Sequence, residues 1–98
     1  MAFYRKSPEA DDDLLRIWRY IAEDNRAAAT QFIDKLHGTM GMLAEMPGMG
    51  RPRDDLAPNI RTFPLGNHLI IYREVSGGIE VARVLSARQD YRRIFSDQ

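Results

Sequence analysis

The sequence contains no cysteine, two histidines and only two lysines among its 98 residues. The lack of cysteine excludes a disulfide framework and any thiolate metal site. The two isolated histidines, His37 and His68, do not make a zinc centre by themselves. We therefore expect a chain that works without a metal or another cofactor.

Long apolar runs are also missing, since no stretch approaches the roughly 18 residues needed to span a membrane. The N-terminus has no apolar segment behind its charges, as a secretory signal would require. These features predict a cytoplasmic protein. With 44% hydrophobic and 29% charged residues, the composition is that of one globular domain, residues 1–98.

The chain also lacks net charge, because 14 basic residues balance 14 acidic ones. Nucleic-acid affinity comes largely from Lys and Arg on phosphates, so we expect no direct sequence-specific nucleic-acid binding. All eight basic residues after residue 50 are arginines. Arginine pairs well with carboxylates, which suits either an acidic protein partner or salt bridges within the chain.

The first half of the chain predicts a strand followed by two helices. Residues 2–6 form the strand, Ser7 caps the first helix, and Pro8 occupies its first position. We interpret the acidic residues that follow as favourable charge at the helix N-terminus. Two apolar stripes, separated by a short break, predict an antiparallel helical hairpin with Trp18 and the methionines in the core. The first stripe is Leu14, Ile17, Trp18, Ile21 and Ala22, and the second is Ala29, Phe32, Ile33, Leu36, Met40, Leu43 and Met46.

The second half predicts a loop and an antiparallel sheet. The proline- and glycine-rich segment 47–53 has neither a helical nor a strand period, and it does not match a phosphate-binding loop. Residues 60–64, 68–74 and 79–85 are rich in β-branched and aromatic residues, and turn residues separate them. Near the C-terminus, Tyr91, Ile94 and Phe95 have the spacing of a short helix.

These elements predict an α+β domain: an N-terminal strand, a helical hairpin packed on a small, mainly antiparallel sheet, and a short C-terminal helix. The last strand is expected to place Ile79, Val81, Arg83 and Leu85 on one face, with Ala82 and Val84 on the other. Neither face alternates cleanly with polar residues, as a sheet open to water on one side should. We therefore expect a partner to cover the face that the hairpin leaves bare.

After residue 46 the chain contains, in this order, the strings PGMGRPRDDL, IRTF, GNHLIIYR, GGIEVARVL and RQD. Together with Leu14, Ile17 and Trp18, these strings resemble ParE-type toxins of the ParE/RelE toxin–antitoxin superfamily. The resemblance extends from Tyr4 to Tyr91. It implies a β-α-α-β-β-β architecture and a cognate ParD-like antitoxin with an amphipathic C-terminal segment, in a hetero-oligomer with the toxin. It also implies a toxin that inhibits DNA gyrase by binding and not as an enzyme.

The superfamily offers an alternative, because RelE-like toxins cut messenger RNA on the ribosome. Cleavage requires a base, an acid and cations that converge on one phosphate. His68 is the candidate base and Tyr91 the proton donor, and the cations would be Arg61, Arg73, Arg83 and Arg88. Neutral net charge and the lack of lysine in the sheet region count against this alternative. A third hypothesis is a decayed toxin that only binds its antitoxin.

Two positions depart from the pattern that the resemblance implies. Ser86 stands where many ParE-like toxins carry histidine, and Gln89 precedes Asp90 where arginine is usual. Both changes put in doubt how much toxicity the chain retains. The residues predicted to contact the antitoxin or the target, each of which could instead belong to the core, are Arg61, Phe63, Tyr72, Arg83, Arg88, Tyr91 and Phe95.

Overall fold

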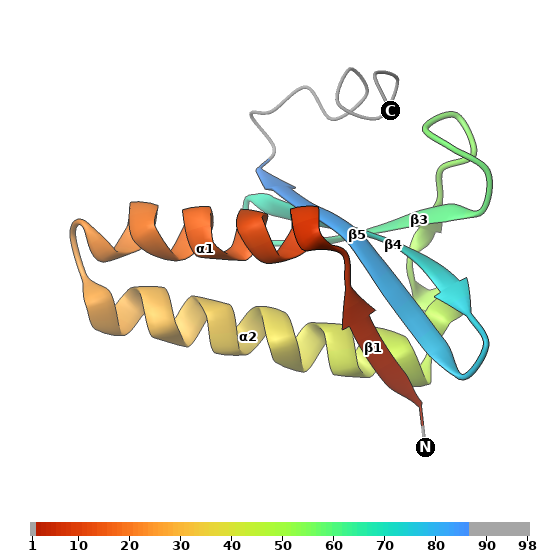
Figure 1. The fold of residues 1–98 in the computed structure, drawn as a ribbon, viewed down its shortest axis with the longest axis horizontal. Helices are drawn as coiled ribbons and strands as arrows, with labels where there is room; N and C mark the ends of the chain where they lie inside the picture. The colour runs from red at the N-terminus through yellow and green to blue at the C-terminus, as the bar shows by residue number, and fades with distance from the viewer. Residues whose placement is uncertain (1, 87–98) are drawn as a thin grey trace.

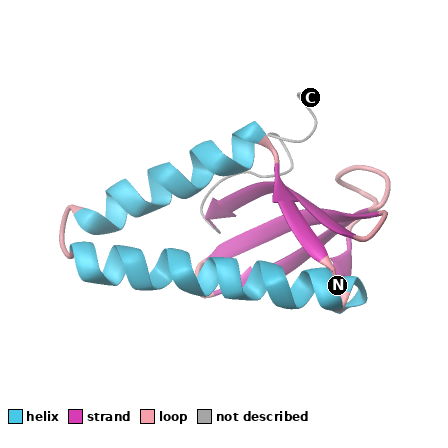
Figure 2. Ribbon diagram, turned by 60° about the horizontal axis from the view of Figure 1, so that its bottom comes forward, coloured by secondary structure: helices cyan, strands magenta, loops and turns pink. Residues whose placement is uncertain are grey.

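A helical hairpin lies on one face of a five-stranded sheet in the computed structural model, which describes residues 2–86 (Figures 1 and 2). The elements, in chain order, are β1 (Phe3–Lys6), α1 (Pro8–Ala22), α2 (Arg26–Glu45), the 3₁₀ helix η1 (Pro47–Met49), β2 (Arg51–Pro52), β3 (Ile60–Leu65), β4 (His68–Val75) and β5 (Gly78–Ser86). The predicted order of strand, two helices and three strands is confirmed, as is the α+β class. The predicted C-terminal helix lies outside the described residues.

The strands follow the spatial order β1-β5-β4-β3-β2. β3, β4 and β5 form an antiparallel meander, whereas β1 pairs parallel with β5. The short strand β2 pairs antiparallel with β3. The segment 47–53 was expected to be a loop without regular structure, and that expectation is wrong because it holds both η1 and β2.

Local sequence sets the boundaries of both helices. The Ser7 side chain accepts a hydrogen bond from the Ala10 amide and Pro8 opens α1, as predicted. Asn25 caps α2 in the same way through the Ala28 amide. No helix in the described part of the chain is long and apolar enough to cross a membrane.

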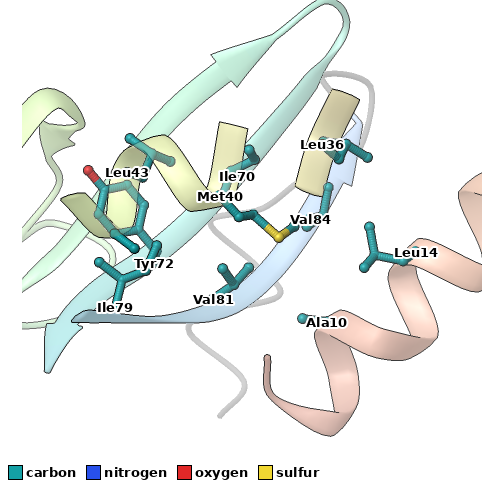
Figure 3. Packing of buried hydrophobic residues seen from close by; sticks show 11 residues of the cluster. Ala10, Leu14, Leu36, Met40, Leu43, Ile70, Tyr72, Ile79, Val81 and Val84 are labelled. Carbon is teal, nitrogen blue, oxygen red and sulfur yellow. The ribbon is translucent and has the colours of Figure 1, made fainter. Parts of the chain in front are cut away.

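The main core lies between the hairpin and the sheet (Figure 3). α1 contributes Ala10 and Leu14, and the sheet contributes a row of aliphatic side chains around the ring of Tyr72. The buried members of this cluster are Ala10, Leu14, Leu36, Met40, Leu43, Ala44, Ile70, Tyr72, Ile79, Val81 and Val84. Burying such side chains stabilises the fold by roughly 1.5 to 3 kcal/mol for each large one.

Trp18 does not belong to this core, contrary to the prediction. It is partly buried, its indole N–H donates to the Thr30 hydroxyl at 3.2 Å, and the Arg26 guanidinium lies 5.8 Å from the ring centroid. Both partners lie on the first half of α2. The indole therefore links the two helices near their connection instead of filling the space above the sheet.

An irregularity in β5 changes which residues face the helices. The pairing of β4 with β5 shifts between Ile71 and Tyr72. Val81 and Val84 consequently both belong to the main core, whereas Leu85 lies in the cluster on the other face. The predicted facing of Arg83 and Leu85 with Val81 is therefore wrong, because strict alternation fails where a strand contains an extra residue.

The far face of the sheet has a small core of its own. Ile71 and Leu85 are 0% exposed and Ile60 is 5% exposed. Partly buried Leu56 and Ala57, from the loop between β2 and β3, pack against them. The expectation that this apolar β surface would need a lid from another molecule is therefore wrong. Among the described residues, the chain covers this surface itself.

Candidate functional site

The predicted site residues of the sheet fall into separate clusters, which we describe in turn. The first joins Asp13 of α1 to the end of β5. The Asp13 carboxylate accepts hydrogen bonds from Arg83 Nε at 2.8 Å, Arg83 Nη2 at 2.9 Å and the Val84 amide at 3.0 Å. The side chain of Asp13 is 2% exposed and that of Arg83 is 14% exposed. This contact is a buried two-pronged ion pair.

The position of this pair follows from the length of β1. Ser7 follows β1, and its hydroxyl donates to the Ala82 carbonyl at 2.7 Å. Beyond that point α1 lies beside β5, and Asp13 supplies the acceptor that a strand neighbour would have offered to Val84. The Asp13 carboxylate also raises the pKa of Arg83. Asp13 was predicted only to favour the helix N-terminus, and no local sequence signal marks its pairing across 70 positions.

The second cluster surrounds the hydroxyl of Tyr72. This hydroxyl donates to the Pro47 carbonyl at 2.6 Å and accepts from the Gly50 amide at 2.8 Å. Arg61 Nη1 donates to the Gly50 carbonyl at 2.8 Å. Burial raises the pKa of Tyr72, while the Gly50 amide and the Arg61 charge act in the opposite direction. The cluster therefore fixes the segment from Pro47 to Gly50 against the sheet.

Tyr72 belongs to the core, since its relative exposure is 0%. The structure thus supports the core alternative that the sequence left open for it. Phe63 is partly buried and packs against the main core. Arg61 and Phe63 lie on the helix-facing side, since Arg61 pairs in register with Tyr72, whose ring is in that core.

The two histidines are engaged in separate ring contacts. His37 Nδ1 lies 2.9 Å from the Tyr4 hydroxyl, which joins α2 to β1. The ring of His68 lies 5.1 Å from that of Phe32, and burial lowers the pKa of His68. The lowered pKa favours the neutral ring of His68, and its aromatic contact with Phe32 is that of a packing residue.

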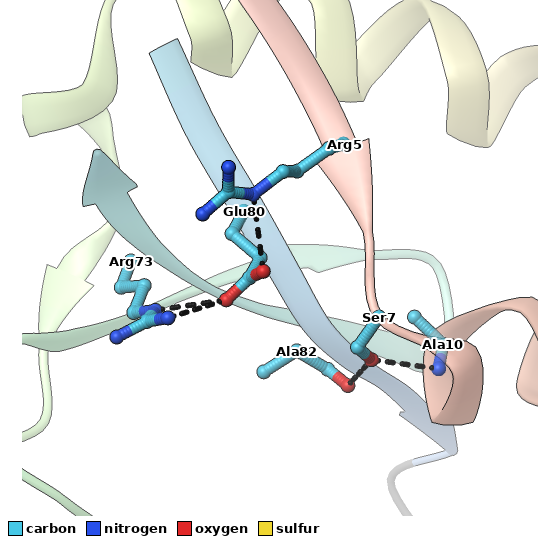
Figure 4. A network of polar contacts seen from close by, with 6 residues as sticks. All are labelled: Arg5, Ser7, Ala10, Arg73, Glu80 and Ala82. Atoms are coloured by element: carbon cyan, nitrogen blue, oxygen red, sulfur yellow. Dashed lines mark hydrogen bonds and ion pairs between the residues drawn. The ribbon is translucent and has the colours of Figure 1, made fainter. Parts of the chain in front are cut away.

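A third cluster lies on the sheet face that points away from the helices (Figure 4). Glu80 of β5 sits between two arginines. Arg5 Nε of β1 is 3.1 Å from Glu80 Oε2, and Arg73 Nη2 of β4 is 2.7 Å from Glu80 Oε1. The hydrogen bonds from Arg73 are the largest cause that lowers the pKa of Glu80. Arg73 was predicted to act only in the ribonuclease alternative, and neither Arg5 nor Glu80 was predicted to belong to a site.

The arginines considered for RNA cleavage do not converge in the described part of the chain. Arg61 points to the helix-facing side of the sheet, whereas Arg73 lies on the opposite face with Glu80. Arg83 is paired with Asp13 at the edge of β5. The remaining predicted residues Arg88, Tyr91 and Phe95 lie outside the described residues. In this arrangement the described arginines pair with groups of the chain itself, and those at the surface can contact a partner.

Comparison with known proteins agrees on one family. The family model for the ParE toxin of the type II toxin–antitoxin system parDE matches residues 4–91. Toxin ParE1 of Caulobacter vibrioides is 37% identical over 92 residues, which cover 91% of this chain and 93% of the relative. Toxin ParE3 of the same organism is 30% identical over 80 residues, with 80% and 79% covered.

A solved structure shares the fold. It is described as the chromosomal ParDE TA system from P. aeruginosa, and one of its chains matches with a TM-score of 0.72. The match covers 88% of this chain and 96% of that chain at 19% sequence identity. At this identity the likeness is one of fold.

Proposed function

The chain belongs to the ParE toxin family of type II toxin–antitoxin systems, and on that premise we propose that it inhibits DNA gyrase by binding to it. We propose further that a ParD-like antitoxin neutralises it in the cytoplasm by forming a hetero-oligomer with it. In this mechanism the toxin forms and breaks no covalent bond. The toxin acts by occupying a surface of its target, and this inhibition ends when the antitoxin binds to the toxin.

The observation that carries the binding mechanism is the way the arginines of the sheet are paired. Arg73 and Arg83 each form an ion pair with a carboxylate, Glu80 and Asp13 respectively. Arg61 donates to a backbone carbonyl. A ribonuclease needs cations that meet at one phosphate with an acid and a base. Three arginines with three different partners on different parts of the sheet do not meet at one phosphate.

Two further observations support the antitoxin as partner. The relatives at 37% and 30% identity are both toxins by name. The solved structure that shares this fold is described as a ParDE system, a pair of toxin and antitoxin. The contact residues that we retain from the sequence are Arg88, Tyr91 and Phe95, together with the half-buried Arg61 and Phe63.

A gyrase assay tests the proposal. Purified chain is added to gyrase and relaxed plasmid, and both supercoiling and trapped double-strand breaks are measured with and without antitoxin. We expect inhibition that the antitoxin reverses, and we expect Tyr91→Ala and Phe95→Ala to weaken it. Arg19→Gln, which removes an exposed charge on α1, serves as the matched control and should leave inhibition unchanged.

A translation extract tests the alternatives in parallel. The binding proposal predicts intact messenger RNA in the presence of the toxin. Cleavage of messenger RNA on the ribosome that disappears in Arg61→Ala or Tyr91→Phe would instead establish the ribonuclease mechanism. A chain that is inert in both assays and harmless on overexpression, but still binds its antitoxin, would be a decayed toxin.

A further inference from the structure

The Arg5–Glu80–Arg73 cluster has features of a prebuilt binding site, and we call it the arginine clamp. Its three side chains come from the adjacent strands β1, β5 and β4 (Figure 4). The side chains of Arg5 and Arg73 are 54% and 51% exposed, whereas that of Glu80 is 22% exposed. The carboxylate therefore lies at the base of the clamp, and the two guanidiniums face solvent.

Glu80 fixes the orientation of both guanidiniums. One carboxylate oxygen accepts from Arg5 Nε, and the other accepts from Arg73 Nε at 2.9 Å and Nη2 at 2.7 Å. Among residues 2–86, no other acceptor pairs with Arg5 Nη1, Arg5 Nη2 or Arg73 Nη1. Two positive charges and one negative charge leave a net charge of +1 on the clamp. The clamp thus presents oriented N–H donors and an uncompensated charge to solvent.

An apolar side chain lies on the same face. Phe3 and Arg5 are two residues apart in β1, so both point to this side of the sheet. Phe3 is 44% exposed, and its ring lies against Gly77 in the turn between β4 and β5. A partner that binds the clamp would therefore meet a hydrophobic anchor beside two arginines.

We propose that the arginine clamp binds an acidic segment of the antitoxin, with carboxylates on the outer nitrogens of Arg5 and Arg73 and an apolar side chain against Phe3. This inference rests on the proposed pairing with an antitoxin. Charge complementarity identifies the occupant, because guanidinium forks match carboxylates in geometry and the clamp carries net positive charge. A nucleic acid fits less well, since its affinity depends on many phosphate contacts and the chain as a whole has no net charge.

Calorimetry measures the affinity of this chain for its antitoxin directly. The antitoxin is the one that is encoded in the same operon as this chain. Arg5→Gln and Arg73→Gln are each expected to weaken binding roughly tenfold or more, the usual effect of losing a charge-assisted hydrogen bond. Arg5→Lys with Arg73→Lys keeps the charge but loses the fork, so it should recover only part of the affinity. Arg19→Gln is the matched control and should stay within about twofold, as exposed single charges do.

Two model ligands separate carboxylate from phosphate recognition. A hexaglutamate peptide should shift the amide resonances of β1, β4 and β5 in nuclear magnetic resonance spectra, and a thymidine hexanucleotide should shift them less. Stronger shifts with the nucleotide would overturn the assignment. It would also be overturned by a folded Arg5→Gln/Arg73→Gln variant that binds antitoxin with unchanged affinity. Because the affinity measurement uses no gyrase, its result does not depend on whether the chain inhibits gyrase.

Discussion

Removing the charge of Asp13 should destabilise the fold more than any other single neutralisation of a carboxylate in α1. In Asp13→Asn the side chain keeps its shape but loses one acceptor oxygen and its charge. Arg83, only 14% exposed, then lacks its counter-charge. The amide oxygen can take the place of Oδ2, which accepts from Arg83 Nε and Val84, but the amide nitrogen then faces Arg83 Nη2, which loses its acceptor. Breaking a buried ion pair in this way costs about 3 to 5 kcal/mol.

That loss is large for a domain of this size, whose total free energy of unfolding is about 5 to 15 kcal/mol. A loss of about 3 kcal/mol should lower the melting temperature by about 12 to 24 °C. Urea unfolding followed by the fluorescence of Trp18, the sole tryptophan, measures the change. Asp12→Asn is the matched control, because Asp12 is the neighbouring aspartate of α1 and is exposed. It should change stability by less than about 0.5 kcal/mol.

A double-mutant cycle isolates the pair itself. Arg83→Met removes the guanidinium while keeping an unbranched apolar side chain. In the double variant no unpaired buried charge remains, so the coupling free energy between the two positions should exceed about 1.5 kcal/mol. A coupling near zero, or an Asp13→Asn variant as stable as Asp12→Asn, would refute the reasoning.

Further predictions concern the Tyr72 cluster, the β1 pairing and pH. Tyr72→Phe leaves the Gly50 amide without its acceptor, so unfolding should become easier by about 1 to 3 kcal/mol and that amide should exchange with deuterium faster. Gly78→Ala should detach β1 in nuclear magnetic resonance spectra, because the new Cβ would collide with the backbone carbonyl of β1 opposite it. Because the pKa of Glu80 is lowered, its stabilising effect is complete above pH 4.5 and is lost as pH falls through the lower folded-state pKa. In Glu80→Gln the free energy of unfolding should therefore depend less on pH over that interval. The lowered pKa of His68 favours the neutral ring, so stability should decline as pH falls below 6.5 toward its folded-state pKa, and His68→Phe should flatten that decline in urea titrations.

Features set by short stretches of sequence could be predicted. The cap at Ser7, Pro8 at the start of α1 and the strand–helix–helix–strand order all depend on neighbours within a few residues. Gly66 and Gly77 both adopt positive φ at the predicted turns, 58° and 86° respectively. Such signals act before any tertiary contact forms, which is why one sequence is enough to find them.

Features set by distant contacts could not be predicted. The carboxylate of Asp13 looks like its acidic neighbours in α1 until β5 is placed beside it. The irregular pairing of β5 turned Leu85 to the far face, and Leu56 covers it from a loop that showed no apolar pattern. The arginine clamp needs the parallel pairing of β1 with β5, which places Arg5 opposite Glu80.

We propose that this toxin acts on gyrase by stoichiometric binding and not by turnover. Titrating purified chain against gyrase, at gyrase concentrations well above the dissociation constant, tests it most directly. Inhibition of supercoiling should rise linearly and reach its maximum at about one toxin for each binding site on gyrase, and excess antitoxin should reverse it. Complete inhibition at a small fraction of that ratio, or messenger RNA cut in large excess over the toxin, would contradict the claim.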